Sequence, residues 1–251
     1  MSKNSDSIKV DLHVHSEGSY DCSEPVDLIL EHAEDIDLDA IAITDHDSIE
    51  KSLEAAEKAE EYDLIGIPGA EVSTKDGHLL ALGVEELPES GQPFMETVET
   101  VRDMGGVAVV PHPFQRTRHG VRKSKIEDVD AVEVYNSWVF TGWRNRKARR
   151  FADDKGYPEV ASSDAHSIGM IGKAYTEINT AFAEDDNFTA DEVLQAIESG
   201  SNYMYGRRKP ILLSTLDYGK AALRKAAWLT KETLFLPITL EKKLLGHSTK
   251  S

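Results

Sequence analysis

The sequence predicts an α/β protein, a distorted (β/α)7 TIM-like barrel that forms a single domain with a C-terminal helical tail. Three observations predict it. The chain has 251 residues, a length that α/β barrels commonly use as one domain. Short β-branched runs alternate with helical patterns, which is typical of right-handed βαβ units and a largely parallel sheet. About seven such runs favour a closed barrel over an open sheet.

The expected strands are short runs rich in β-branched and other apolar residues. They are IKVDLHV (8–14), AIAIT (40–44), LIGIPGAEV (64–72), HLLALGV (78–84), GVAVVP (106–111), AVEVYN (131–136) and PEVASS (158–163). Between several of these runs the apolar residues recur at helical spacing, which predicts amphipathic helices. These helices are expected at Val26–Asp35, Ile49–Glu61, Phe94–Met104 and Arg144–Lys155.

Composition indicates a globular protein of a reducing compartment. The chain is 40% hydrophobic, with glycine and proline spread along it. Its single cysteine, Cys22, allows no internal disulfide and fits a cytoplasmic location. The first residues lack an apolar signal core, and no apolar run reaches the roughly 18 residues of a membrane span. We therefore expect neither secretion nor a membrane partner.

The charge is strongly negative and unevenly distributed. The whole chain carries a net charge of −17, but residues 207–251 carry ten Lys+Arg against three Asp+Glu. An acidic surface keeps a protein soluble and repels nucleic-acid backbones. We interpret residues 1–206 as the domain that carries the function. Residues 207–251 are expected to form a basic helical extension that packs on the acidic body or on a partner subunit rather than binding DNA.

Histidines and acids recur at the ends of the expected strands. His13 and His15 are two residues apart in one run, so both project from one face of a strand. Barrel enzymes build their sites from the C-terminal ends of several strands. Neutral imidazole and ionised carboxylate are ligands of Zn, Mn and Fe ions, and the lack of thiolates argues against a closed structural zinc site. The other residues in this pattern are His46, Glu71, His112, Asp164 and His166.

Two basic segments flank the late strands. QRTRHGVRKSK (115–125) follows the run that ends in PHP, so Arg116, Arg118 and Arg122 could grip a phosphate or a neighbouring anionic group there. WRNRKARR (143–150) is interpreted as a solvated helix face, since clustered charge usually lies on the surface. We expect Arg116 and Arg118 to act on the substrate.

Five motifs in order resemble the PHP (polymerase and histidinol phosphatase) family of metal-dependent phosphoesterases. They are DLHVHS with Asp21 downstream, TDHD, GAEVS with GHLLALG, PHP, and SSDAHS followed by IGKAYTEI. The resemblance covers roughly residues 8–206, and it is closest to the small stand-alone members. Some relatives carry a further histidine after the sixth strand, where this chain reads EVYNSWVF.

The resemblance implies two to three divalent metal ions, of Mn, Zn or Fe. His13, His15 and Asp164 would hold the first ion, and Glu71 would bridge it to the second. His78 and His112 would complete the second position. Asp45 would orient a ligand or the attacking water. A third set would consist of Asp21, His46 and His166.

The leading functional hypothesis is a metal-dependent phosphoesterase that hydrolyses esters of nucleotides or short nucleic-acid ends through a metal-activated water. A metal pair about 3.5–4 Å apart can lower the pKa of a shared water and clamp the oxygens of a phosphoryl displacement. The alternatives are a histidinol-phosphate phosphatase, a hydrolase of non-phosphate esters and a non-catalytic metal-binding module. The complete set of ligand types argues against the last. The expected partner is a small phosphorylated substrate, and the oligomeric state is left open.

Overall fold

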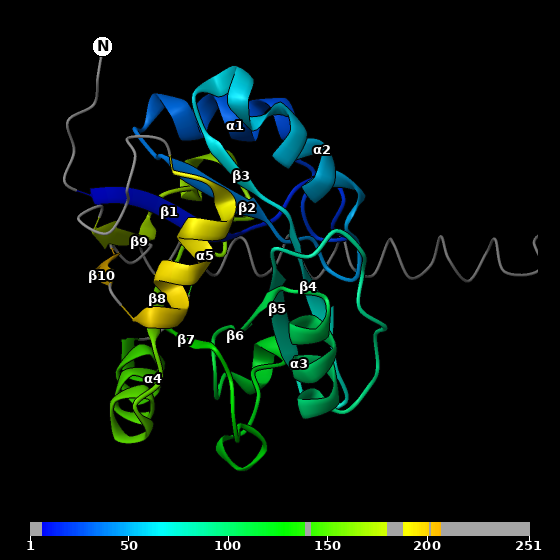
Figure 1. The fold of residues 1–251 in the computed structure, drawn as a ribbon, viewed down its shortest axis with the longest axis vertical. Helices are drawn as coiled ribbons and strands as arrows, with labels where there is room; N and C mark the ends of the chain where they lie inside the picture. The colour runs from blue at the N-terminus through cyan, green and yellow to red at the C-terminus, as the bar shows by residue number, and fades with distance from the viewer. Residues whose placement is uncertain (1–6, 139–141, 180–187, 201, 207–251) are drawn as a thin grey trace, which may run out of the picture.

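The protein is a mixed α/β fold with two five-stranded sheets (Figure 1). The computed structural model describes residues 7–138, 142–179, 188–200 and 202–206. In the first sheet the strand order is β10-β9-β1-β2-β3, and in the second it is β4-β5-β6-β7-β8. The α/β class predicted from the sequence is therefore confirmed.

The first sheet joins the beginning and the end of the described chain. Its three early strands pair in parallel, whereas β9 pairs antiparallel with both β1 and β10. The strands are β1 (Ser7–Val14), β2 (Ala40–Ile43), β3 (Ile65–Ile67), β9 (Ala174–Asn179) and β10 (Asn202–Gly206).

The second sheet begins with a hairpin and continues in parallel. β5 is antiparallel to both β4 and β6, and β6, β7 and β8 are parallel. The strands are β4 (Gly69–Ser73), β5 (His78–Leu82), β6 (Val107–Val110), β7 (Ala131–Asn136) and β8 (Glu159–Ser162).

Helices cover the outer faces of both sheets. The α-helices are α1 (Val26–Asp35), α2 (Glu50–Lys58), α3 (Phe94–Asp103), α4 (Gly142–Lys155) and α5 (Ala190–Ser199). In Figure 1 α1 and α2 lie at one end of the molecule and α4 lies at the other. None of the described helices is long and apolar enough to span a membrane, and the cytoplasmic location stays a prediction.

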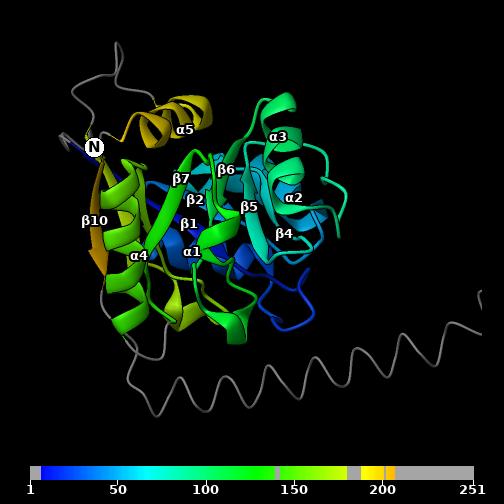
Figure 2. The same cartoon turned by 90° about the horizontal axis from the view of Figure 1, so that it is seen from below.

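The core has an inner part between the sheets and two outer parts under the helices. β6 shows the division, because Val107 and Val109 pack inward with residues of β1 while Ala108 and Val110 pack outward with those of α3 and α4. This alternation is what the two-residue period of a strand requires. Apolar residues of α5 fill one end of the inner core, and α1 and α2 pack on the outer side of the first sheet. Figure 2 shows α5 at that end, away from the loops that follow the strands.

The predicted closed barrel is not confirmed by the described residues. Among the described residues, the β-pairing between the two sheets is limited to isolated bridges, Val14 with Ala165 and His46 with Glu71. The run expected as one strand at 64–72 is divided at Pro68, which has no N–H to donate to a ladder, and its halves belong to different sheets. The expected tail, residues 207–251, lies outside the described residues.

Candidate metal centre

All nine residues predicted as metal ligands lie around one site, where the carboxyl ends of β1, β2, β6 and β8 meet the amino end of β5. Four groups of their side-chain atoms each lie within 4.8 Å of one another. Both bridges between the sheets are also at this end, so the chain segments that carry the ligands are held together there. The groups are His15, Asp21, His46 and His166; His13, His112 and Asp164; His13, His15 and Glu71; and His46, Glu71 and His78.

Glu71 is at the centre of the cluster, and its two carboxylate oxygens face different histidines. Oε1 lies 2.8 Å from Nδ1 of His78 and 2.9 Å from Nε2 of His112. Oε2 lies 3.3 Å from Nε2 of both His13 and His15, and 3.1 Å from Nδ1 of His46. The side chain is fully buried. One oxygen therefore faces the expected second position and the other faces the expected first position, which is the arrangement of a bridging carboxylate.

The first and third sets predicted from the sequence also gather, and two residues are shared between sets. Oδ1 of Asp164 lies 3.6 Å from Nε2 of both His13 and His15. Oδ2 of Asp21 lies 3.1 Å from Nε2 of His166 and 3.6 Å from Nε2 of His46. His15 groups with this third set as well, and His46 groups with Glu71 and His78.

Two of the predicted ligands follow strands in an unusual backbone conformation. His112 has a φ of 29° and Asp164 has a φ of 54°. Such left-handed values in residues other than glycine carry strain of order 1–3 kcal/mol, and they cluster at functional sites. At both positions the chain leaves a strand and turns, with the side chain directed into the cluster.

Burial controls the protonation of three of the histidines. It lowers the pKa of His46 and of His112, and it lowers the pKa of His166 to about 4. These imidazoles are therefore neutral near pH 7, the state in which a ring nitrogen can bind a metal.

The two histidines of β1 have the opposite shift. Burial lowers the pKa of His13 and His15, but the carboxylates of Asp164 and Glu71 outweigh it and raise both values, to about 9 for His15. For Glu71 burial raises the pKa, and the surrounding histidines outweigh this and hold it well below the usual range. The carboxylates of the site are therefore negatively charged, and without a metal ion their charge is balanced by protons on His13 and His15 of β1.

The donor set fits divalent metal ions. Six imidazoles and three carboxylates converge with no thiolate, the combination that suits Zn, Mn and Fe. Nδ1 of His46 and Nδ1 of His112 are buried without a hydrogen-bond partner. Five histidine nitrogens crowd around the single carboxylate of Glu71, within 3.3 Å. Bound cations would give such nitrogens a partner.

A buried carboxylate that the sequence analysis did not single out supports the cluster from behind. Oε1 of Glu133 lies 3.3 Å from Nδ1 of His13 and accepts from Ser162 Oγ at 2.5 Å. Oε2 accepts from the backbone N–H of His112 at 2.6 Å and from Asn136 Nδ2 at 2.8 Å. Glu133 therefore holds the far nitrogen of His13 and leaves Nε2 for the metal. In the sequence, this residue could have been noticed as the single acid inside the apolar run AVEVYN.

Asp45, predicted to orient a ligand or the attacking water, and Arg116 and Arg118, predicted to act on the substrate, lie in different places. Asp45 is buried and its carboxylate accepts from the backbone and the hydroxyl of Ser16, at 2.7 and 2.5 Å, so it is turned away from the cluster. Arg118 is buried, donates to both oxygens of Asp164 and lies 3.9 Å from the centre of the Trp138 ring. Arg116 is exposed and lines the pocket described next.

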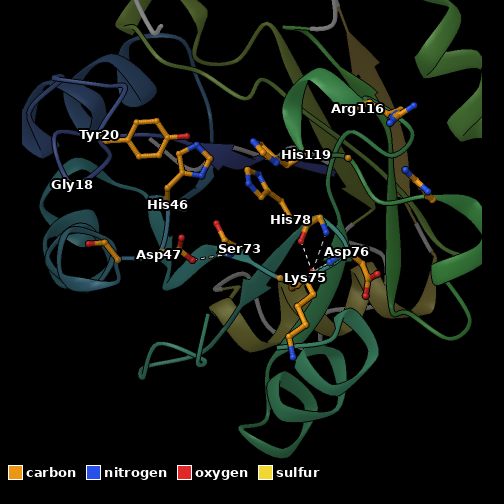
Figure 3. Close-up of a pocket in the computed structure, with 15 residues that line it drawn as sticks. Gly18, Tyr20, His46, Asp47, Ser73, Lys75, Asp76, His78, Arg116 and His119 are labelled. Carbon is orange, nitrogen blue, oxygen red and sulfur yellow. Dashed lines mark hydrogen bonds between the residues drawn. The ribbon is translucent and has the colours of Figure 1, made fainter. Parts of the chain in front are cut away.

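A pocket of about 710 Å³ opens beside the cluster (Figure 3). His46 and His78 form part of its wall. Tyr20 stacks on His46 at 4.9 Å between ring centres, and His119 stacks on His78 at 5.1 Å. The pocket is also lined by cationic side chains, Lys75, Arg116 and Arg122. A ligand in this space would meet two of the predicted metal ligands, together with three cations and the acids Asp47 and Asp76.

Comparison with known proteins gives matches along most of the described chain. A model described as the PHP domain matches residues 11–127, and one described as PHP-associated matches residues 142–202. Two uncharacterized proteins of Methanocaldococcus jannaschii are each 29% identical to this chain. The match to MJ0417 covers 76% of this chain and 79% of MJ0417, and the match to MJ1587 covers 56% of this chain and 89% of MJ1587.

Solved structures share the fold. A two-domain protein from Bacteroides vulgatus, containing a predicted PHP-like metal-dependent phosphoesterase, has a TM-score of 0.66 at 18% identity, and the match covers 85% of this chain and 70% of that one. Endonuclease Q, in complex with a duplex substrate that has an abasic lesion at the active site, has a TM-score of 0.56 at 17% identity. The match covers 80% of this chain and 60% of that one.

Proposed function

We propose, since this chain belongs to the PHP family, that it is a metal-dependent hydrolase of phosphate esters. The observation that carries the proposal is the position of Glu71, whose two oxygens face two different groups of histidines. A carboxylate in that position can bridge a pair of ions. Two to three ions are proposed, because the nine clustered side chains are more than one ion can use.

The proposed ligand sets are those that the family resemblance implies, although His112 also groups with His13 and Asp164, and His78 with His46. His13, His15 and Asp164 would hold one ion and His78 with His112 a second, with Glu71 shared between them. Asp21, His46 and His166 would hold a third. When bound, such ions lower the pKa of a water and neutralise the charge that develops on a phosphoryl group.

The other side chains of the site would position these ligands and bind the substrate. Glu133 would keep Nδ1 of His13 protonated, so that Nε2 stays free as a ligand. Arg118 would fix the plane of Asp164 through its paired hydrogen bonds. Arg116 and Arg122, which line the pocket, would bind anionic groups of the substrate beyond the ester that is cleaved.

The proposed substrates are nucleotides or the ends of nucleic-acid strands. Cations in the pocket favour a substrate with more than one anionic group, and Endonuclease Q, which shares the fold, acts on nucleic acid. A histidinol-phosphate phosphatase would need a free acid for the substrate's amine. Of the pocket acids, Asp76 is paired with Lys125, and exposed Asp47 accepts from Ser73 and Ser90 on Oδ1 alone, so the cations Lys75, Arg116 and Arg122 outnumber the acids open to an amine.

The proposal is tested by metal analysis together with hydrolysis. Protein purified without chelator should contain at least two equivalents of metal, and it should hydrolyse a nucleoside monophosphate in the presence of Mn²⁺. Glu71→Gln should stay folded by circular dichroism and lose at least about a hundredfold in kcat/KM, because the amide cannot bridge two cations. Near-normal turnover of folded Glu71→Gln would overturn the assignment of the bridge.

A further inference from the structure

Two basic segments that are far apart in the sequence form one surface. Residues 115–125 and 142–151 contain ten of the 28 Lys+Arg of the chain and no Asp or Glu. The first segment contains the 3₁₀ turns Arg116–Arg118 and Lys123–Lys125, and the second is most of α4. Such a concentration is notable in a protein whose net charge is −17.

Contacts show that the two segments are packed together. Arg144 of α4 donates to the backbone oxygen of Phe114, and Nζ of Lys147 lies 4.6 Å from the centre of the Phe114 ring. From the other side, Nζ of Lys123 lies 5.3 Å from the centre of the Phe151 ring of α4. The same segment contributes Arg116 and Arg122 to the pocket. Positive charge therefore runs from the pocket along this segment to α4.

Several exposed cations of α4 are spaced so that they repel one another along the helix. Arg146 and Arg150 are four residues apart, and both lie three residues from another exposed cation. Like charges at these spacings destabilise a helix, and Asp153 and Asp154, four residues beyond Arg149 and Arg150, offset this for those two arginines. Across the described ranges, Arg149 pairs with Glu159 at 3.6 Å, while Arg146, Lys147 and Arg150 have no carboxylate partner. Packing does not explain Arg146 and Arg150, which are exposed, whereas Lys147 is exposed but lies over the Phe114 ring.

We propose that this surface, formed by the 115–125 segment and α4, binds the phosphate backbone of a single-stranded nucleic acid whose end enters the pocket. The inference rests on the proposed function for the identity of the site, and it extends the substrate from short molecules to strands. Backbone binding needs cations spread over several phosphates, and this surface supplies them outside the pocket. The acidic remainder of the molecule would repel the strand, so the strand is confined to this path.

An exposed aromatic ring on the surface favours a single strand over a duplex. Trp143, in the first turn of α4, is 55% exposed, and the charged groups of Arg144 and Lys147 lie 5.1 and 5.7 Å from its ring. Unpaired bases stack on such rings, whereas the bases of a duplex are already stacked on each other. Cations beside the ring hold the phosphates that flank a stacked base.

The test compares two triple variants with the same change in charge. Arg146→Gln, Lys147→Gln and Arg150→Gln remove the free cations of α4. Lys9→Gln, Lys58→Gln and Lys173→Gln remove three cations near α1 and α2, at the opposite end of the molecule (Figure 1). Binding of a labelled single strand of about 12 nucleotides is measured by anisotropy in EDTA, so the result does not depend on catalysis.

The α4 variant should bind the strand at least about tenfold more weakly, and its salt slope should fall by about 2, since each neutralised phosphate of a single strand contributes about 0.7. The control variant should bind like the wild type. Trp143→Ala should weaken the single strand about tenfold and a duplex of equal length much less. Hydrolysis of p-nitrophenyl phosphate should be unchanged in the α4 variant.

Equal binding by the two triple variants would overturn the inference and leave the proposed function intact. Tighter binding of duplex than of single strand, with no effect of Trp143→Ala, would overturn the single-strand assignment. If the wild type binds strands through α4 but hydrolyses no phosphate ester with any metal, the surface is upheld and the proposed function fails. The same anisotropy measurement with DNA and RNA strands of one sequence identifies which backbone the protein prefers.

Discussion

Two buried glutamates of the site make different sets of contacts. Glu71 faces histidine nitrogens on both of its oxygens, so it has the surroundings of a ligand. Glu133 accepts from a hydroxyl, an amide and a backbone N–H as well as facing His13, so its oxygens have no room for a cation. The contrast assigns Glu133 to positioning a histidine, as in the carboxylate–histidine pairs that support many metal sites.

Replacing Glu133 with Gln should weaken metal binding about 10–100-fold, the range typical when such a support is removed. The new amide can donate to Nδ1 of His13, which moves the ring proton to Nε2 and blocks the ligand atom. Glu177→Gln, which loses only a contact with Ser7, is the matched control. Metal affinity is measured by chelator competition. Long-range ¹⁵N spectra of the zinc-loaded protein report which nitrogen of His13 is protonated. Unchanged spectra and affinity would contradict the assignment.

Metal binding should release protons below about pH 9. The pKa of His15 is raised to about 9 in the metal-free protein, so at pH 7 its ring is protonated and must lose that proton to bind a metal. The pKa of His13 is raised as well, so both rings must lose a proton, and apparent affinity should rise by at least about tenfold per pH unit between pH 7 and 8. His166, with a pKa of about 4, adds nothing in this range. Calorimetry in buffers of different ionisation enthalpy counts the protons, and a pH-independent affinity would contradict the prediction.

Most of the residues proposed as ligands could be singled out from the sequence because they lie at or beside one end of an apolar run, whereas Asp21, well beyond the end of β1, came from the family resemblance. The supporting residues could not, because a strand pattern does not say which partner an inward side chain meets. Arg118 shows the limit: a basic loop beside the site indicated substrate binding, but the turn at 116–118 buries this side chain against Asp164 and Trp138. Its neighbour Arg116 stays exposed at the pocket.

At the scale of elements, the hairpin of β4 and β5 places two ligands, Glu71 and His78, on adjacent strands. Its turn depends on Gly77, whose φ of 145° is accessible to glycine alone. A Cβ at this position would lie 2.3 Å from the backbone oxygen of His119, which also accepts from the N–H of His78 at 2.9 Å. The turn thus sets the position of His78 against the 115–125 segment.

Gly77→Ala should therefore reduce both stability and metal binding. We expect a loss of about 1–3 kcal/mol in the free energy of unfolding, since the backbone must leave its present conformation. Gly169→Ala is the control, because nothing lies within 4 Å of a Cβ there and its effect should stay within about 0.5 kcal/mol. Urea unfolding of both metal-free variants decides the point. A loss no larger than the control's would mean that the turn relaxes without strain.

Helices could be predicted more fully than strand pairing. Amphipathic spacing predicted α1 over its full length and α3 to within one residue. The expected strands were also found, but β9, β10 and α5 were not predicted, and the pairing of β4, β5, β9 and β10 is antiparallel rather than parallel. A hydrophobic run indicates that a strand is buried, but it does not indicate whether the neighbouring strand runs parallel or antiparallel to it. This is why the sequence favoured a closed parallel barrel.

At the scale of the whole molecule, the acidic surface affects folding stability and the basic surface affects the proposed strand binding. With 45 Asp+Glu against 28 Lys+Arg, many carboxylates have no cation to pair with. Described surface pairs such as Lys58 with Asp27 and Arg102 with Asp128 are exposed, and pairs of this kind contribute at most about 1 kcal/mol each. Repulsion among the unpaired carboxylates is therefore expected to dominate the electrostatics of folding.

Added KCl should accordingly raise the melting temperature while it weakens strand binding. Screening shortens the reach of charge from about 10 Å at 0.1 M to about 3 Å at 1 M, which relieves repulsion over the acidic body. The same screening, with counterion competition, removes the attraction of the 115–125 segment and α4 for phosphates. Calorimetry and anisotropy on one salt series measure both effects, and sucrose serves as the non-ionic control. A melting temperature that falls with KCl would show that surface ion pairs outweigh repulsion, contrary to the charge balance of the chain.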